Sequence, residues 1–158
     1  TLKSQDQASF EKAFQKLLDG LFLAALLVAV ATQLLASTVI EFLFGAPYAP
    51  ASKILEVHIW SGVFVFMREA FSRWILIEGV LKFSFITHGL GMIFNVGLNI
   101  FLIPLYQGVG AAYATLLSYA MAAYLSLMFH SGTRPVFFMM SRSILFPFRL
   151  ILARGKSL

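Results

Sequence analysis

The feature that most constrains the fold of this chain is residues 20–40, an apolar run without a single charged side chain. A helix needs about 20 apolar residues to cross the hydrocarbon core of a bilayer. Two further runs of that length, 83–105 and 109–129, contain no Asp, Glu, Lys or Arg. A fourth run, 54–76, is apolar but carries several charged residues. The pattern therefore predicts four transmembrane helices, at about these four ranges.

The overall composition excludes an ordinary soluble domain. Hydrophobic residues make up 59% and charged residues 12% of the 158 residues, whereas soluble domains hold about 45–50% and about 25%. A soluble fold of this size cannot bury so much apolar surface. The sequence therefore predicts an all-α integral membrane protein. The absence of cysteine excludes disulfides and thiolate metal sites.

The connections between the predicted helices are short and rich in turn residues. Proline and glycine mark residues 44–52, FGAPYAPAS, and residues 104–110, PLYQGVG. Pro104 lacks the N–H that a continuing helix needs, and glycine tolerates positive φ. Neighbouring helices are therefore expected to be antiparallel.

The distribution of basic residues predicts the orientation. Lys and Arg concentrate in residues 1–19, around the connection between 54–76 and 83–105, and in residues 130–158. The positive-inside rule puts these segments, and so both ends of the chain, on the cytoplasmic side. The turns at 44–52 and 104–110 then face outside. Because the basic residues flank apolar runs rather than form one patch, the formal charge of +5 does not indicate a nucleic-acid partner.

Residues 1–19 and 130–158 are predicted to be amphipathic segments at the cytoplasmic surface. In the first, apolar residues such as Phe10 and Phe14 recur at helical spacing among charged residues. In the second, apolar residues are mixed with arginines such as Arg142. Basic amphipathic helices of this kind lie in the plane of the membrane interface. Partial insertion of the tail is the alternative.

A polar face runs along the predicted helix 83–105. Its members are spaced by 4, 3, 4 and 4 positions, which puts them on one side of a helix: Ser84, His88, Gly91, Asn95 and Asn99. An unsatisfied amide in hydrocarbon costs several kcal/mol. This face is therefore expected to meet other helices or a hydrated cavity.

The predicted helix 109–129 carries a matching face of small residues. They have the same spacing, and they are Ala111, Thr115, Ser118, Ala122 and Ser126. Small residues allow two helix backbones to approach closely, and Gly91 is expected to take part in this packing. Two hypotheses for Asn95 and Asn99 remain open. Either these amides hydrogen-bond the two helices together, or they line a transport path and bind a hydrophilic cargo.

Arg68 is the most unusual charge in the predicted helix 54–76. No acidic residue lies three or four positions away from it, so it has no ion-pair partner on its own helix. An arginine inside a membrane indicates a functional site. Arg68 either extends to phospholipid headgroups or attracts an anionic group, such as a pyrophosphate, into a central cavity.

No catalytic constellation is present. The sequence has no paired-carboxylate motif, no metal-binding spacing such as HExxH, no nucleophile elbow and no phosphate-binding loop. The histidines are scattered over three predicted helices. We therefore expect a protein that is not an enzyme and that uses neither a metal nor a cofactor.

The segment around the second turn resembles a family of transporters. It reads Asn95-x-x-Leu98-Asn99-x-x-Leu102-Ile103-Pro104, followed by Gly110-Ala111-Ala112-x-Ala114-Thr115-x-x-Ser118-Tyr119. These motifs resemble the polysaccharide flippases of the multidrug/oligosaccharidyl-lipid/polysaccharide exporter superfamily, which include the O-antigen flippases. LFGAPYAPA, residues 43–51, is similar to that family's LFG-x-x-Y-x-x-A turn. One position departs from the pattern, because the family usually has glycine after the tyrosine and this chain has Gln107.

The resemblance implies a transporter of about twelve helices in two lobes, in which this chain would form the last four helices of the C-terminal lobe. The cargo would be an undecaprenyl-pyrophosphate-linked oligosaccharide, moved across the bacterial inner membrane for the synthesis of surface polysaccharide such as lipopolysaccharide O-antigen or exopolysaccharide. The partners would be this polyprenyl pyrophosphate lipid, the surrounding membrane lipids and an N-terminal lobe of the same protein. Candidate residues for the hydrophilic, cationic cavity of such a transporter are Arg68, His88, Asn95 and Asn99.

Other functions remain open. A multidrug antiporter of the same superfamily would export organic cations and would need a buried carboxylate. The carboxylates here lie near the ends of the predicted helices or, at Glu69, beside arginines. A membrane scaffold without transport activity is a further alternative. A membrane glycosyltransferase is disfavoured, because no connection is long enough for a catalytic loop.

Overall fold

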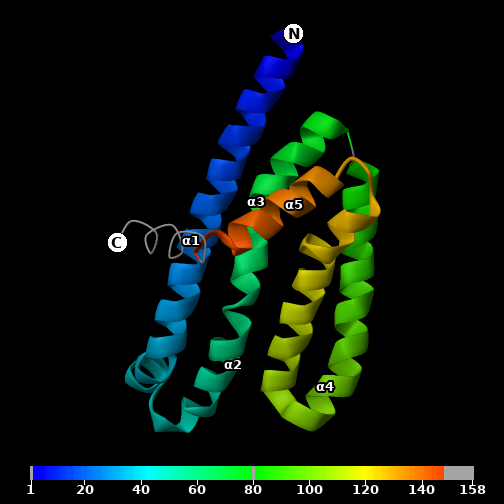
Figure 1. The fold of residues 1–158 in the computed structure, drawn as a ribbon. Coiled ribbons are helices and arrows are strands. Elements are labelled where there is room, and N and C mark those ends of the chain that lie inside the picture. The colour runs from blue at the N-terminus through cyan, green and yellow to red at the C-terminus, as the bar shows by residue number, and fades with distance from the viewer. Residues whose placement is uncertain (1, 80, 148–158) are drawn as a thin grey trace, which may run out of the picture.

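The computed structural model describes residues 2–79 and 81–147, and within these ranges it contains helices and no strand (Figure 1). The elements follow one another as α1 (Leu2–Phe44), the 3₁₀ helix η1 (Ala46–Tyr48), α2 (Pro50–His58), α3 (Ser61–Glu78), α4 (Leu81–Ala123), the 3₁₀ helix η2 (Leu125–Phe129) and α5 (Arg134–Ile144).

Helix α1 combines two segments that the sequence separates. The amphipathic residues 1–19 and the apolar residues 20–40 were expected to be distinct, but from Leu2 onward they form one helix. No proline occurs before Pro47, so nothing in this part of the sequence breaks the helix. It ends at Phe44, and the next residue, Gly45, has a φ of 84° that is unfavourable for any residue with a side chain.

The predicted helix 54–76 is divided into α2 and α3. The break lies at Ile59 and Trp60, where i→i+3 hydrogen bonds replace part of the α-helical pattern. The Ser61 hydroxyl donates to the carbonyl oxygen of His58 at 2.7 Å. This local bond competes with the backbone ladder and favours a bend.

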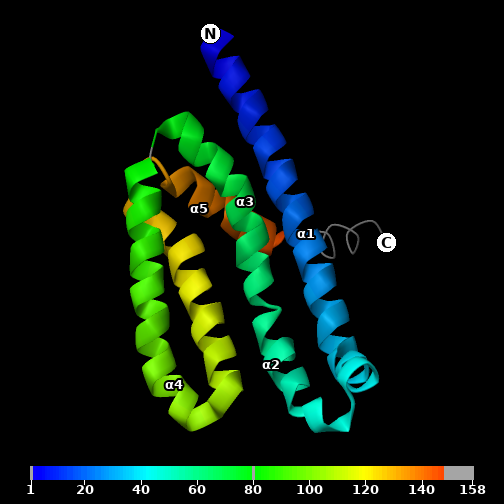
Figure 2. The ribbon, with the colours of Figure 1, turned by 180° about the vertical axis from the view of Figure 1, so that it is seen from behind.

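Helix α4 contains a reversal of the chain. It runs toward one end of the molecule and returns beside itself, as Figures 1 and 2 show. The reversal is at Gln107, which has φ 53° and ψ −132° and so adopts a conformation usually reserved for glycine. We call residues 81–106 the first arm and residues 108–123 the second arm. The predicted turn at 104–110 is therefore present, although it is tighter than a loop between two separate helices.

The two arms touch at the reversal. A Cβ atom added to Gly110 would lie 2.2 Å from the carbonyl oxygen of Leu102. No side chain fits there, so glycine is required by the contact between backbones. The second arm is shorter than predicted, because the helix ends at Ala123 and the segment that includes Ser126 forms η2.

Neighbouring helices are antiparallel, as expected from the short connections. The turn after α1 and the reversal of α4 lie at one end of the molecule (Figures 1 and 2). We call this the turn end. The C-terminal end of α3 and the start of α4 lie at the other end, near α5.

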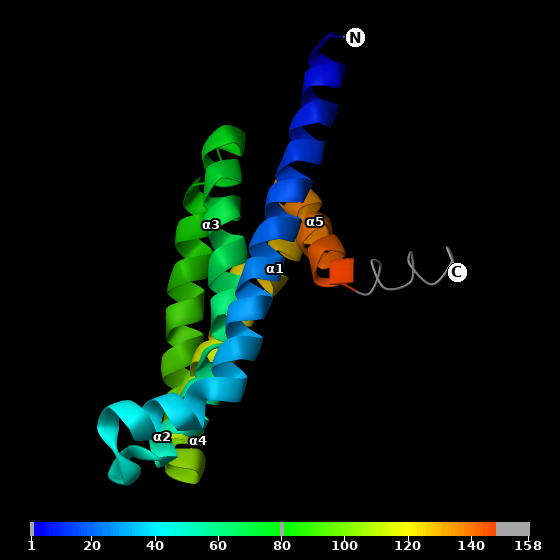
Figure 3. The same cartoon turned by 90° about the vertical axis from the view of Figure 1, so that its left-hand side faces the viewer.

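The main core lies between α1, α3, η2 and α5. Its largest fully buried apolar side chains are Phe71, Leu18, Met67, Leu127, Met140 and Val136. Figure 3 shows α5 against the side of α1. The predicted tail 130–158 was expected to lie on the membrane surface, but the apolar face of α5 is buried in the protein. Residues 148–158 of that tail lie outside the described residues.

A group of hydrogen bonds fastens α5 to α1. The Gln15 amide nitrogen lies 2.9 Å from the Ser143 hydroxyl and 3.1 Å from the Met139 carbonyl oxygen. The Ser143 hydroxyl donates to the Asp19 carboxylate at 2.6 Å. We call Gln15, Asp19 and Ser143 the α1–α5 clasp.

Two stretches of the described chain are long and apolar enough to cross a membrane. They are Ala8–Phe44, with a mean hydropathy of 2.2 in its most apolar part, and Leu81–Phe129, with 1.6. The core helix of a soluble protein also passes this test, but it is mostly buried. In these two stretches only 17% and 6% of the most apolar part is buried.

Candidate functional site

A cavity of about 470 Å³ lies between α3 and the two arms of α4. We call it the arginine cavity. It brings together seven residues that the sequence singles out: Arg68, His88, Gly91, Asn95, Thr115, Ser118 and Ala122. These residues are up to 54 positions apart in the sequence. They meet because the first arm turns its polar face toward the second arm and α3 closes the third side.

Arg68 enters the cavity from α3 and is in contact with His88 on the first arm. The contact joins Arg68 Nη2 and His88 Nε2. A guanidinium can only donate hydrogen bonds, so the imidazole nitrogen is the acceptor in a hydrogen bond between them. The described residues provide no ion pair for Arg68.

The two amides of the polar face have different positions. Asn95 lines the arginine cavity and Asn99 does not. Asn99 Nδ2 donates to Asn95 Oδ1 at 2.9 Å, so the amides bond to each other along the first arm. Among the described residues neither amide bonds to the second arm. The structure therefore gives no support to direct amide bonds between the arms, and the NH₂ group of Asn95 stays available to a ligand.

Small residues allow the close approach of the two arms. A Cβ atom added to Gly91 would lie 2.6 Å from the Cβ atom of Ala122. The hydroxyls of Thr115 and Ser118 donate to carbonyl oxygens of their own helix, at 3.0 and 2.7 Å. Their hydrogens are thus satisfied, and their oxygens can still accept. Ala111 is partly buried in the second arm and does not line the cavity.

Two lining residues of the cavity were not predicted from the sequence to belong to it. Glu69 and Tyr119 both line it. Glu69 follows Arg68 directly in the sequence and is exposed. Tyr119 follows Ser118 in the family-like motif, and this adjacency was the available signal. The lining residues therefore include one acidic residue, Glu69, and one arginine, Arg68.

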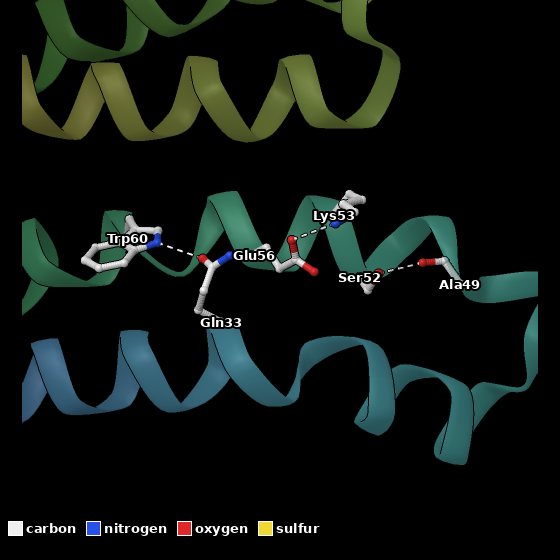
Figure 4. A network of polar contacts seen from close by, with 6 residues as sticks. All are labelled: Gln33, Ala49, Ser52, Lys53, Glu56 and Trp60. Carbon is white, nitrogen blue, oxygen red and sulfur yellow. Dashed lines mark hydrogen bonds and ion pairs between the residues drawn. The ribbon is translucent and has the colours of Figure 1, made fainter.

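A second cavity, of about 430 Å³, lies between α1, α2 and the second arm. Figure 4 shows the polar contacts beside it. The Trp60 indole N–H donates to Gln33 Oε1 at 3.0 Å, and Lys53 Nζ lies 3.3 Å from Glu56 Oε2. No lining residue is shared with the arginine cavity.

The described residues contain no group of three or more His, Asp or Glu side chains that could hold a metal ion. Comparison of the chain with family models, curated proteins and solved structures finds no match. The fold and the site thus define an all-helical chain with two long apolar helical stretches and a polar cavity between α3 and α4.

Proposed function

We propose that this chain is the C-terminal part of a flippase that moves undecaprenyl-pyrophosphate-linked oligosaccharide across the bacterial inner membrane. The observation that carries the proposal is the position of Arg68 in the arginine cavity, beside His88 and Asn95 and without an ion pair among the described residues. A guanidinium with free donors suits the oxygens of a pyrophosphate. The family-like motifs on both arms of α4 support the same function.

In this proposal the chain crosses the membrane four times. The crossings are α1, α2 together with α3, and each arm of α4. The outward side of the first arm carries large exposed apolar residues such as Phe85, Ile93 and Phe101, which suit lipid or the helices of another lobe. Both ends are cytoplasmic, and the turn end faces the periplasm. An N-terminal lobe of the same protein completes the transport path, so we expect no transport by this chain alone.

One observation favours a second function. Glu69 lines the arginine cavity, and a carboxylate there is what a multidrug antiporter of the same superfamily would need to bind organic cations. The adjacent guanidinium of Arg68 repels a cation from the same space. Anionic cargo is therefore the better match to the lining.

The proposal is tested by replacing Arg68 in the full-length protein that carries this chain. Arg68→Ala is expressed in a bacterium that lacks the gene, and surface polysaccharide is measured at matched protein levels. We expect a loss of at least about tenfold, since a hydrogen bond to a charged group contributes about 1.5–3 kcal/mol. Arg142→Ala, which removes an exposed arginine of α5, is the matched control and should leave the polysaccharide unchanged.

The same strains distinguish the second function. Normal polysaccharide in Arg68→Ala contradicts the flippase proposal. Loss of resistance to organic cations in Glu69→Gln, with polysaccharide intact in both variants, assigns the cavity to a cation antiporter instead.

A further inference from the structure

We propose that the second cavity, between α1, α2 and the second arm, binds one neutral sugar ring. Its volume of about 430 Å³ lies in the range of small-molecule sites, which is about 300–1,000 Å³. Its lining joins two aromatic residues, Trp60 and Tyr113, to three polar residues, Gln33, Lys53 and Glu56. Aromatic walls with a few convergent polar groups are typical of ligand sites.

The charges of the lining favour a neutral ligand. Lys53 and Glu56 are the charged residues of this cavity, and they form an ion pair with each other at 3.3 Å. An anion would have to displace the carboxylate from Lys53, and a cation would have to displace the ammonium from Glu56. A neutral ligand requires neither displacement.

The orientation of the Gln33 amide is fixed by its partner. The indole N–H of Trp60 can only donate, so the atom of Gln33 that faces it at 3.0 Å must be the oxygen (Figure 4). The NH₂ group is consequently on the other side of the amide and has no hydrogen-bond partner among the described residues. Two N–H donors on a fixed side chain are thus available to a ligand.

Acceptors are present beside these donors. Lys53 engages Glu56 through Oε2, and Oε1 has no partner in the described part of the chain. The Tyr113 hydroxyl, which can donate and accept, also makes no hydrogen bond there. Each hydroxyl of a sugar both donates and accepts, so a ring with neighbouring hydroxyls can use Gln33, Glu56 and Tyr113 together.

The apolar part of the lining matches the rest of a sugar ring. The faces of a pyranose present C–H groups, whereas its edge presents hydroxyls. Trp60 and Tyr113 offer apolar ring surface, and Val57, Val109 and Leu116 complete the lining. A purely apolar ligand would leave the polar groups of the cavity unpaired, which costs binding free energy.

The role of this site rests on the proposed function, but binding itself does not. Lys53 and Val109 lie close to the two turns of the turn end. If that end faces the periplasm, the cavity is placed to hold a sugar of the cargo after its pyrophosphate has left Arg68.

The test is saturation-transfer NMR on the full-length protein in lipid nanodiscs. The probes are D-glucose, D-galactose, D-mannose and N-acetylglucosamine, with tetramethylammonium as a cationic probe. We expect transfer to the ring protons of at least one sugar. Gln33→Glu keeps an acceptor for the Trp60 indole but removes both donors, and Tyr113→Phe removes only the hydroxyl. Each should weaken binding by roughly threefold to tenfold, the range for one lost hydrogen bond.

Arg142→Ala is the matched control, because it removes an exposed arginine of α5 that lines neither cavity and should leave sugar binding unchanged. The proposal is overturned if no sugar binds, if both pocket variants bind as the unchanged protein does, or if tetramethylammonium binds in preference to every sugar. Sugar binding that Gln33→Glu weakens supports the site even where Arg68→Ala makes normal polysaccharide. Failure of the sugar site is thus distinguishable from failure of the flippase proposal.

Discussion

The core around α5 and the hairpin formed by the two arms of α4 are packed with side chains of different kinds. In the core, large apolar side chains from α1, α3, η2 and α5 are buried together, including Phe71, Leu18 and Met140. In α4, the fully buried residues that the structure describes are small or polar, and they are Thr87, Gly110, Ala112, Ala114, Ser118 and Ala123. The large apolar residues of its first arm point outward, with Phe85 82% and Phe101 71% exposed.

This difference separates two sources of stability. The core gains free energy by removing apolar surface from water, as in any globular protein. The hairpin gains little in that way, because its apolar surface stays exposed. Its two arms are held by close contact of small residues and backbone, which is the usual means of helix packing in membranes. If the exposed apolar surface of the two arms faced water, it would associate with other molecules.

The largest effect is expected from a pair of phenylalanine substitutions. Phe71→Ala should lower the free energy of unfolding by about 3–5 kcal/mol, because Phe71 is only 1% exposed and its removal leaves a cavity. Phe85→Ala should change it by less than about 0.5 kcal/mol, since surface substitutions do so. The measurement is unfolding in mixed dodecyl maltoside and SDS micelles, followed by circular dichroism. Equal losses in both variants would remove the distinction between core and hairpin.

A smaller loss is expected at the reversal of α4. Gly110→Ala should cost about 3 kcal/mol, the upper part of the range for overpacking, because the added Cβ meets backbone atoms of Leu102 that cannot rotate away. Gly89→Ala is the matched control in the same helix, where an added Cβ finds nothing within 4 Å. The control should be neutral or slightly stabilising. A tolerated Gly110→Ala would mean that the arms do not touch at this point.

The smallest of the three effects concerns the α1–α5 clasp. Ser143→Ala should cost about 2 kcal/mol, within the range for leaving buried polar partners unsatisfied, because Asp19 and Gln15 lose a shared partner. Ser72→Ala removes an exposed hydroxyl that bonds only to its own helix, at the carbonyl of Glu69. It should be close to neutral under the same unfolding assay. Equal changes in the free energy of unfolding in the two variants would mean that the core does not depend on the hydrogen bonds of the α1–α5 clasp.

Local patterns predicted most of α4 and little of the core. The spacing of Ser84, His88, Gly91 and Asn95 defines one side of any helix, so the polar face followed from the sequence alone. Pro104 and the nearby glycines likewise located the reversal. Its geometry was not predictable, because Gln107 takes the positive φ that the family-like pattern assigns to glycine.

The core depends on contacts between segments that are distant in sequence. The apolar face of α5 is compatible with a membrane surface or with a protein surface, and the pattern of residues is the same in both cases. Only the structure shows Val136 and Met140 against the core. The sequence did not predict the break between α2 and α3, because neither glycine nor proline occurs at Ile59, Trp60 or Ser61.

The arginine cavity was predictable in part. Arg68, His88 and Asn95 were identified because polar residues in apolar runs need partners. Asn99 shares their face, but the cavity ends before it. Glu69 lies next to Arg68 in the sequence, but nothing in the residue pattern indicates that it lines the same cavity.

Helix α1 is continuous between the α1–α5 clasp and the second cavity. Gln15, in the α1–α5 clasp, and Gln33, bonded to Trp60, belong to the same continuous helix. They are 18 positions apart, and at a rise of 1.5 Å per residue about 27 Å of helix axis separates them. A straight helix transmits a shift or a rotation along its length. A movement of α5 is therefore expected to shift the part of α1 that lines the second cavity.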